Sequence, residues 1–347
     1  MSARKVEPEI AAPHPRETAE LFGHREAETA LLNAYRSGRI PHAWLIGGAQ
    51  GIGKATLAYR MARFVLAHRD PLSASVQRAE TLAVDPSDHV ARQIAAGSHG
   101  GLLTLERSLN ERGVMRTVIT VDETRETISF FGSTAAVEGW RVCIVDTVDE
   151  LNPNAANALL KILEEPPQQS LFLLVSHAPA RVLPTIQSRC RKLPLRPLAT
   201  SEVIRAAALA TGMAADDPAL AEAAEAAEGS VARALTLLGG DALKLHQRTA
   251  ALLARLPQVD PRELHALGDS LGLSDRVALA AFVDSVERWV SDRLRADRDA
   301  NANLPRLARL AEVWEKIVRA ARDTQDYNLE RKPLVFSVFS MLAEATR

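Results

Sequence analysis

The chain has 347 residues, of which 47% are hydrophobic and 24% charged, so it can form a sizeable core and is long enough for two or three domains. Its net charge of −1 argues against a protein that is basic throughout, although it allows a local phosphate-facing patch. Two cysteines, Cys143 and Cys190, are too few for a disulfide framework or a four-cysteine zinc site, which fits a cytoplasmic protein. Residues 1–20 form a polar leader without a signal-peptide core, and no apolar run reaches the roughly 20 residues of a membrane span.

The first 200 residues alternate predicted strands and helices. Short apolar runs indicate strands buried on both faces of a parallel sheet, and apolar residues at helical spacing indicate the connecting helices. Residues 70–101 form an irregular insertion that is partly helical near 90–96. This pattern predicts an α/β domain. The predicted strands are 42–46, 102–105, 142–145, 171–175 and 192–198, and the predicted helices are 24–38, 55–68, 121–136 and 154–163.

A glycine-rich loop joins the first strand to the second helix. It contains Gly48, Gly51 and Gly53 and ends in Lys54, with the full spacing of a P-loop. Glycines let backbone N–H groups surround phosphates, the helix N-terminus adds positive potential, and the lysine reaches the outer phosphates. This loop is a strong indication of descent from a nucleotide-binding site.

The residue after the lysine departs from the P-loop pattern. A Ser or Thr there holds the magnesium ion through its hydroxyl group, but this chain has Ala55. Thr56 follows one residue late, roughly 100° further around the helix. Two interpretations remain open: a loop that is kept for the fold and holds no nucleotide, or one that binds ATP or ADP but handles magnesium poorly.

Residues 141–191 contain further candidate site residues. Asp146 closes one buried strand and Ser176 closes the next, and the carboxyl ends of parallel strands are where ligands bind. The helix between these strands stops at Pro166-Pro167, and a short helix then leads to a basic cluster with Arg189 and Arg191. By itself, this cluster is typical of a solvated basic helix end.

Three histidines fall in or near the insertion but do not indicate a metal site. His68, His89 and His99 lack close ligand spacing and have no cysteines beside them, so ordinary surface histidines are favoured.

The C-terminal part of the chain is helical by pattern. Residues 200–240 are alanine-rich and are predicted to form three short helices. From residue 241 onward, breaks near 257–261, 272–274 and 299–305 predict a bundle of about five helices. Their alanine and leucine stripes are typical of a core and carry no chemistry of their own.

Together these motifs resemble bacterial clamp-loader subunits of the AAA+ class. The resemblance rests on the P-loop, on the run ALLKILEEPP at 158–167 and on Ser188-Arg189-Cys190. It is strong over the α/β domain, moderate over the following helices and weaker in the C-terminal bundle. It implies an α/β AAA+ domain over 1–198, a helical lid over 199–240 and a helical collar over 241–347.

The resemblance also implies partners and a role for one arginine. Clamp loaders are ATP-driven hetero-pentamers that open a ring-shaped sliding clamp and place it on primer-template DNA. The implied partners are therefore gamma/tau motor subunits, a delta subunit, the clamp and, through the complex, DNA, but no membrane. Arg189 matches the arginine of the SRC motif and would be an arginine finger, offered to the γ-phosphate of a neighbouring subunit's ATP.

Departures from the family pattern weaken the chain's own nucleotide site. Ala55 removes the magnesium hydroxyl, and Thr147 follows Asp146 where active members have a water-positioning glutamate. Ala232 stands where active members carry a phosphate-sensing arginine, with Arg233 one residue late. The insertion lacks the four cysteines of many relatives, so no zinc is expected.

The prediction is therefore a subunit with little or no catalytic activity of its own. Arg189 serves a neighbour, and any nucleotide binds at a degenerate site. The alternatives are an active AAA+ motor subunit of the same or a related complex and, less favoured, a P-loop kinase or phosphotransferase. The residues of the degenerate nucleotide site are Gly48, Gly51, Gly53, Lys54, Thr56, Asp146 and Ser176.

Overall fold

The computed structural model divides the chain into two compact units. One runs from Ala12 to Ala232, and the other contains Arg233–Arg347. The residues whose structure is described are 13–108, 116–132, 139–239, 241–272, 276–299, 304–327 and 329–346.

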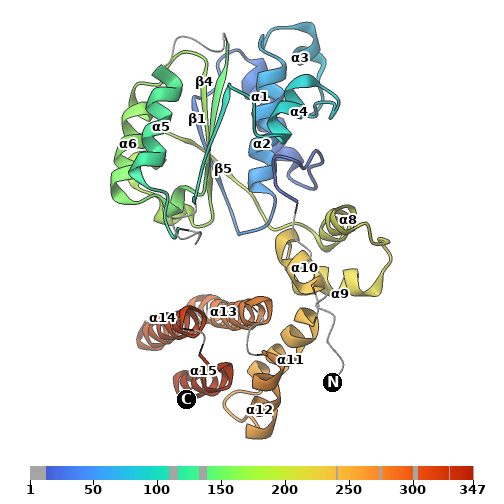
Figure 1. Ribbon diagram of the computed structural model, residues 1–347, viewed down its shortest axis with the longest axis vertical. Helices are drawn as coiled ribbons and strands as arrows, with labels where there is room; N and C mark the ends of the chain where they lie inside the picture. The colour runs from blue at the N-terminus through green and yellow to red at the C-terminus, as the bar shows by residue number, and fades with distance from the viewer. Residues whose placement is uncertain are drawn as a thin grey trace. The chain divides into compact units, whose positions relative to one another are not determined.

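A five-stranded parallel sheet forms the centre of the first unit (Figure 1). The strand order is β2-β3-β4-β1-β5, so β1 lies between two strands that follow it far along the chain. The last strand is shorter than the segment 192–198 predicted for it. The strands are β1 (Ala43–Gly47), β2 (Leu102–Glu106), β3 (Arg141–Asp146), β4 (Ser170–Ser176) and β5 (Arg191–Pro194).

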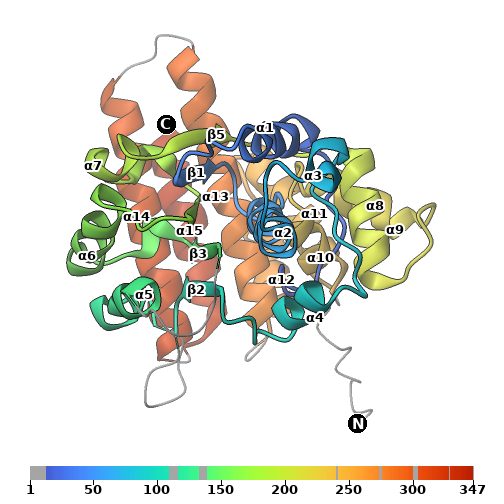
Figure 2. The same cartoon turned by 90° about the horizontal axis from the view of Figure 1, so that it is seen from above.

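Helices cover both faces of this sheet, as Figures 1 and 2 show. Helices α1 and α2 pack on one face, and α5 and α6 pack on the other. Of the predicted helix 121–136, residues 133–136 lie outside the described residues. The insertion contains two short helices, one of them where helix was expected. The bounds are α1 (Arg25–Arg36), α2 (Lys54–Ala67), α3 (Ala74–Arg78), α4 (His89–Ala95), α5 (Val121–Gly132), α6 (Pro153–Glu164) and α7 (Pro184–Gln187).

The rest of the described chain is helical, so the predicted fold class, an α/β domain followed by all-α regions, is confirmed. Three short helices follow the sheet, the last of which continues into the second unit, and five further helices contribute to the core of that unit. No helix among the described residues is long and apolar enough to cross a membrane. These helices are α8 (Thr200–Thr211), α9 (Pro218–Ala226), α10 (Val231–Leu238), α11 (Ala242–Ala254), α12 (Pro261–Ser270), α13 (Arg276–Asp299), α14 (Leu304–Asp326) and α15 (Arg331–Thr346).

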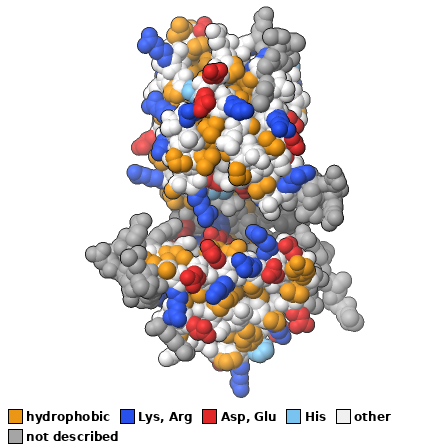
Figure 3. Space-filling view, turned by 90° about the vertical axis from the view of Figure 1, so that its left-hand side faces the viewer, with side chains coloured by type: hydrophobic (Ala, Val, Ile, Leu, Met, Phe, Trp, Pro, Cys, Tyr) orange, Lys and Arg blue, Asp and Glu red, His pale blue; other side chains and the backbone are white. Residues whose placement is uncertain are grey.

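Charged side chains of both signs are mixed on the described surface. On the face drawn in Figure 3, basic and acidic groups alternate with hydrophobic ones within each unit. This distribution agrees with the net charge of −1.

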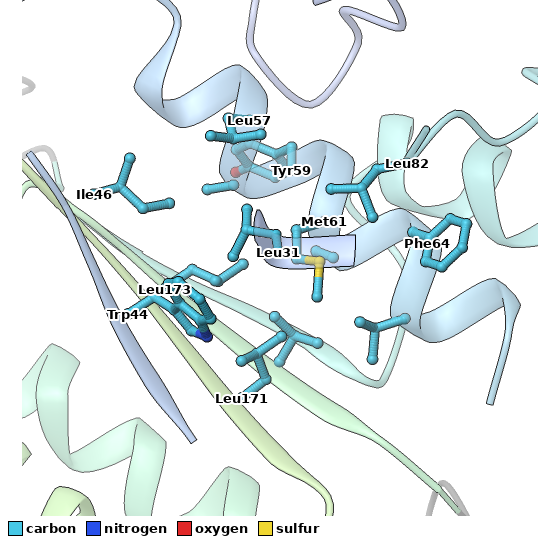
Figure 4. Close-up of a cluster of buried hydrophobic side chains, with 14 of the residues drawn as sticks. Leu31, Trp44, Ile46, Leu57, Tyr59, Met61, Phe64, Leu82, Leu171 and Leu173 are labelled. Atoms are coloured by element: carbon cyan, nitrogen blue, oxygen red, sulfur yellow. The ribbon is translucent and has the colours of Figure 1, made fainter. Parts of the chain in front are cut away.

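The strands fill two separate cores with alternate residues. Trp44 and Ile46 of β1 face α1 and α2, whereas Ala43 and Leu45 face α5 and α6. Leu173 of β4 lies in the first of these cores, among the side chains of β1 and α2 (Figure 4). Because side chains alternate along a strand, the register of the sheet is fixed from both sides.

Leu173→Ala should lower the free energy of unfolding by about 2–5 kcal/mol, because it opens a cavity where the leucine is 0% exposed. Urea denaturation followed by circular dichroism measures the change. Leu209→Ala is the matched control on helix α8, where the leucine is 57% exposed, and it should change stability by less than about 0.5 kcal/mol. Equal effects of the two substitutions would contradict the assignment of Leu173 to the core.

Candidate functional site

The candidate nucleotide site lies at the carboxyl edge of the sheet, where β1, β4 and β3 are neighbours. The P-loop begins directly after Gly47, which is in register with Ser176 of β4. Asp146, the last residue of β3, is in register with Val175. The structure therefore brings the P-loop, Asp146 and Ser176 to one edge, as expected for parallel strands.

The start of helix α10 packs directly on the P-loop. The Gly51 carbonyl accepts hydrogen bonds from the backbone N–H groups of Val231, at 2.9 Å, and Ala232, at 3.4 Å. A methyl group at Gly51 would lie 2.3 Å from Ser230 Oγ and 2.8 Å from Ala232 Cβ, and the residue has φ +75°. Glycine is required at this position both for the turn and for the close approach of α10.

The P-loop lysine is bound by its own loop. Lys54 is only 3% exposed, and its Nζ donates to the carbonyls of Gly48 at 2.9 Å and Ala49 at 2.5 Å. Burial lowers the pKa of Lys54 to about 8, although Asp146 and Asp149 oppose the shift. The ammonium group that would face the outer phosphates of a nucleotide is therefore engaged within the loop.

Asp146 ends β3 at the site, in register with Glu106 of β2. Burial, together with Glu106, raises its pKa, and Lys54 opposes this shift. The next residue, Thr147, is buried and has no carboxylate with which to orient a water molecule. Thr56 lies half-buried in the first turn of α2, one position after Ala55.

Asp149 connects the end of β3 to the end of β4, a role that the sequence did not indicate. Its carboxylate accepts a hydrogen bond from Ser176 Oγ at 2.7 Å and another from the backbone N–H of His177 at 2.5 Å. The predicted site hydroxyl of Ser176 therefore has a partner within the chain. Burial lowers the pKa of His177 to about 4, with Lys54 also lowering it, so this side chain is neutral at pH 7.

His24 is a second contact that sequence analysis missed. It precedes α1, and its Nε2 lies 2.7 Å from the carbonyl oxygen of Ile52 in the P-loop. The sequence indicated only that a helix begins near His24. The contact could not be predicted, because His24 precedes Ile52 by 28 residues and no motif links the two positions.

Ala232, which the sequence places at the phosphate-sensing position, packs on Gly51. Within the second unit, the Arg233 guanidinium forms an ion pair with Asp284 of α13 at 2.9 Å.

Arg189 follows α7 and is held by two groups. Its Nη1 donates to the Thr185 carbonyl at 2.8 Å, and its Nη2 donates to Glu164 Oε1 at 2.5 Å. The next residue, Cys190, is buried in the same core as Ile186 and Leu163, which anchors the backbone on either side. The arginine side chain itself is 32% exposed and is accessible to an anion from outside the chain.

The histidines of the insertion have local roles in the structure. His68 packs against Phe64, with ring centroids 4.7 Å apart, and the Nδ1 of His99 accepts the backbone N–H of Gly101 at 3.0 Å. Among the described residues, no group of three or more His, Cys, Asp or Glu side chains has the arrangement of a metal site.

Comparison with known proteins identifies relatives. A DNA polymerase III subunit delta′ of Pseudomonas aeruginosa is 37% identical over 149 residues, covering 43% of this chain and 41% of that protein. A subunit tau/gamma of Haemophilus influenzae is 28% identical, covering 64% of this chain and 30% of the relative. A subunit gamma/tau of Mycobacterium bovis is also 28% identical, covering 82% of this chain and 49% of the relative. The chain thus spans less than half the length of these relatives.

The family profile described as "DNA polymerase III, delta subunit" matches residues 23–199. This segment is slightly more than half of the chain. It contains the P-loop, the ends of β3 and β4, and Arg189. The chain therefore belongs to the DNA polymerase III delta-subunit family, as its clamp-loader motifs predicted.

Proposed function

We propose that the chain is a delta-prime-like subunit of the DNA polymerase III clamp loader, which places the sliding clamp on primed DNA during replication. The family match and the delta′ relative support this assignment. Its proposed partners are gamma/tau motor subunits and a delta subunit in a hetero-pentamer, and DNA contacts the chain only as part of that complex. We also propose three domains, which are an α/β AAA+ domain over 1–198, a helical lid over 199–240 and a helical collar over 241–347.

The proposed subunit does not hydrolyse ATP. Ala55 cannot offer a hydroxyl to magnesium, and Thr147 cannot position the attacking water. Lys54 already donates to two carbonyls of its own loop, and a nucleotide would have to displace these contacts. The two hydrogen bonds from Lys54 to the carbonyls of Gly48 and Ala49 are the observation that most directly supports a nucleotide site that is empty or weak.

Arg189 is proposed to act on a neighbouring subunit's ATP. A guanidinium has five N–H donors, and Thr185 and Glu164 engage two of them. The remaining donors and the exposed part of the side chain can meet a γ-phosphate in trans, where positive charge stabilises the transition state. The chain thus keeps the group that serves a partner and lacks the groups that serve itself.

A motor ATPase remains the second candidate. One observation favours it: the gamma/tau relatives align with 64% and 82% of this chain, more than the delta′ relative does. The glycine and lysine spacing of the P-loop is also complete.

ATP turnover by the isolated chain distinguishes these candidates. We expect no phosphate release above background, and Lys54→Ala should leave the turnover of the reconstituted clamp loader unchanged. Lys192→Ala, which removes an exposed lysine, is the control for the loss of one charge. Turnover by the isolated chain that disappears in the Lys54 variant would establish the motor instead.

Arg189→Ala tests the contribution in trans. In the reconstituted complex, hydrolysis at the site that faces Arg189 should slow by roughly 10³-fold, the lower end of the effect of an arginine finger. Clamp-stimulated ATP turnover and clamp loading on primed DNA are the measurements. Arg181→Ala removes an exposed arginine from the same stretch of chain and should have no effect. Normal loading by the Arg189 variant would exclude the finger role.

A further inference from the structure

The last residue of helix α6 holds the candidate finger. Glu164 precedes the Pro166-Pro167 stop, and its Oε1 accepts a hydrogen bond from Arg189 Nη2 at 2.5 Å. The Thr185 carbonyl accepts from Nη1 of the same guanidinium at 2.8 Å. The two acceptors come from different segments, α6 and α7, so they constrain the guanidinium from two directions.

Both segments are anchored by the core beneath them. Leu163 of α6 and Ile186 of α7 are 1% exposed and belong to the same hydrophobic cluster, together with Cys190. The backbones that carry the carboxylate and the guanidinium are therefore fixed relative to each other. A contact between side chains on two such anchored segments reduces the number of rotamers open to a long arginine.

The contact contributes little to stability. The Arg189 side chain is 32% exposed and that of Glu164 is 50% exposed. Ion pairs between such solvent-exposed groups contribute little to the free energy of unfolding, because water screens them. The contact fixes the direction of a partly exposed guanidinium that keeps further N–H donors, and orientation is what catalysis by a positioned charge requires.

We propose that Glu164 is a positioning residue for Arg189, holding the guanidinium in the orientation from which it reaches the ATP of the neighbouring subunit. This inference rests on the proposed role of Arg189 as a finger. Glu164 would act only through the arginine. Its carboxylate and the Thr185 carbonyl define the direction of the guanidinium before the partner arrives.

Glu164→Ala in the reconstituted clamp loader tests the proposal. We expect kcat for clamp-stimulated ATP hydrolysis at the site facing Arg189 to fall by roughly 10- to 100-fold, as expected for a misplaced catalytic group, with KM for ATP unchanged. Glu164→Gln keeps an oxygen acceptor and should restore most of the rate. Glu165→Ala is the matched control, because it removes the adjacent exposed glutamate and should leave turnover unchanged.

A double variant separates positioning from a general structural role. Glu164→Ala combined with Arg189→Ala should be no slower than Arg189→Ala alone, because Glu164 acts only through the arginine. A slower double variant would overturn the proposal, as would unchanged or raised turnover in Glu164→Ala when Arg189→Ala is impaired. If Arg189→Ala itself has no effect on turnover, the finger role of Arg189 is wrong, and the positioning role of Glu164 is wrong with it. Gel filtration of each complex confirms that assembly is equal.

Discussion

The parallel pairing of β1 with β4 is the constraint on which the rest of the first unit depends. Because β3 pairs with the other edge of β4, the carboxyl ends of three strands meet although their residues are far apart in sequence. The register that places Gly47 beside Ser176 also buries Trp44 on one face and Phe172 on the other. A shift by one residue would exchange the two faces, so core packing and site geometry are specified together.

The same edge shows how the P-loop is joined to the rest of the fold. The lysine of a P-loop requires acceptors, and here the chain supplies its own. Lys54 meets the carbonyls of Gly48 and Ala49, and α10 closes over Gly51. The loop is thereby integrated into the fold, and Gly48 and Gly51 leave no room for a side chain against the segments packed on them. Asp149 similarly satisfies the polar groups at the end of β4.

Arg189 contrasts with this closed site. Its guanidinium is held at the surface by acceptors from two anchored segments and retains further donors. Lys54 is turned inward, whereas Arg189 remains accessible. This contrast is the basis of the proposal that Arg189 acts on a neighbouring subunit's ATP while the chain itself does not hydrolyse ATP. In the proposed role the anchoring of α6 and α7 matters, because a charged group stabilises a transition state only from a fixed position.

The sequence by itself determined the strands, most helices and the P-loop. It also showed that Ala55 replaces the hydroxyl residue of the P-loop pattern, because periodicity, glycine spacing and residue identity are local properties. It also predicted that Asp146 and Ser176 share an edge, since parallel strands align their ends. Only the tertiary structure decided which polar groups meet. The contacts of Lys54 with its loop, Asp149 with Ser176, and Glu164 with Arg189 depend on side-chain directions and on elements distant in sequence. No local pattern records such pairings, because each is set by how the packed helices and strands bring separate segments together.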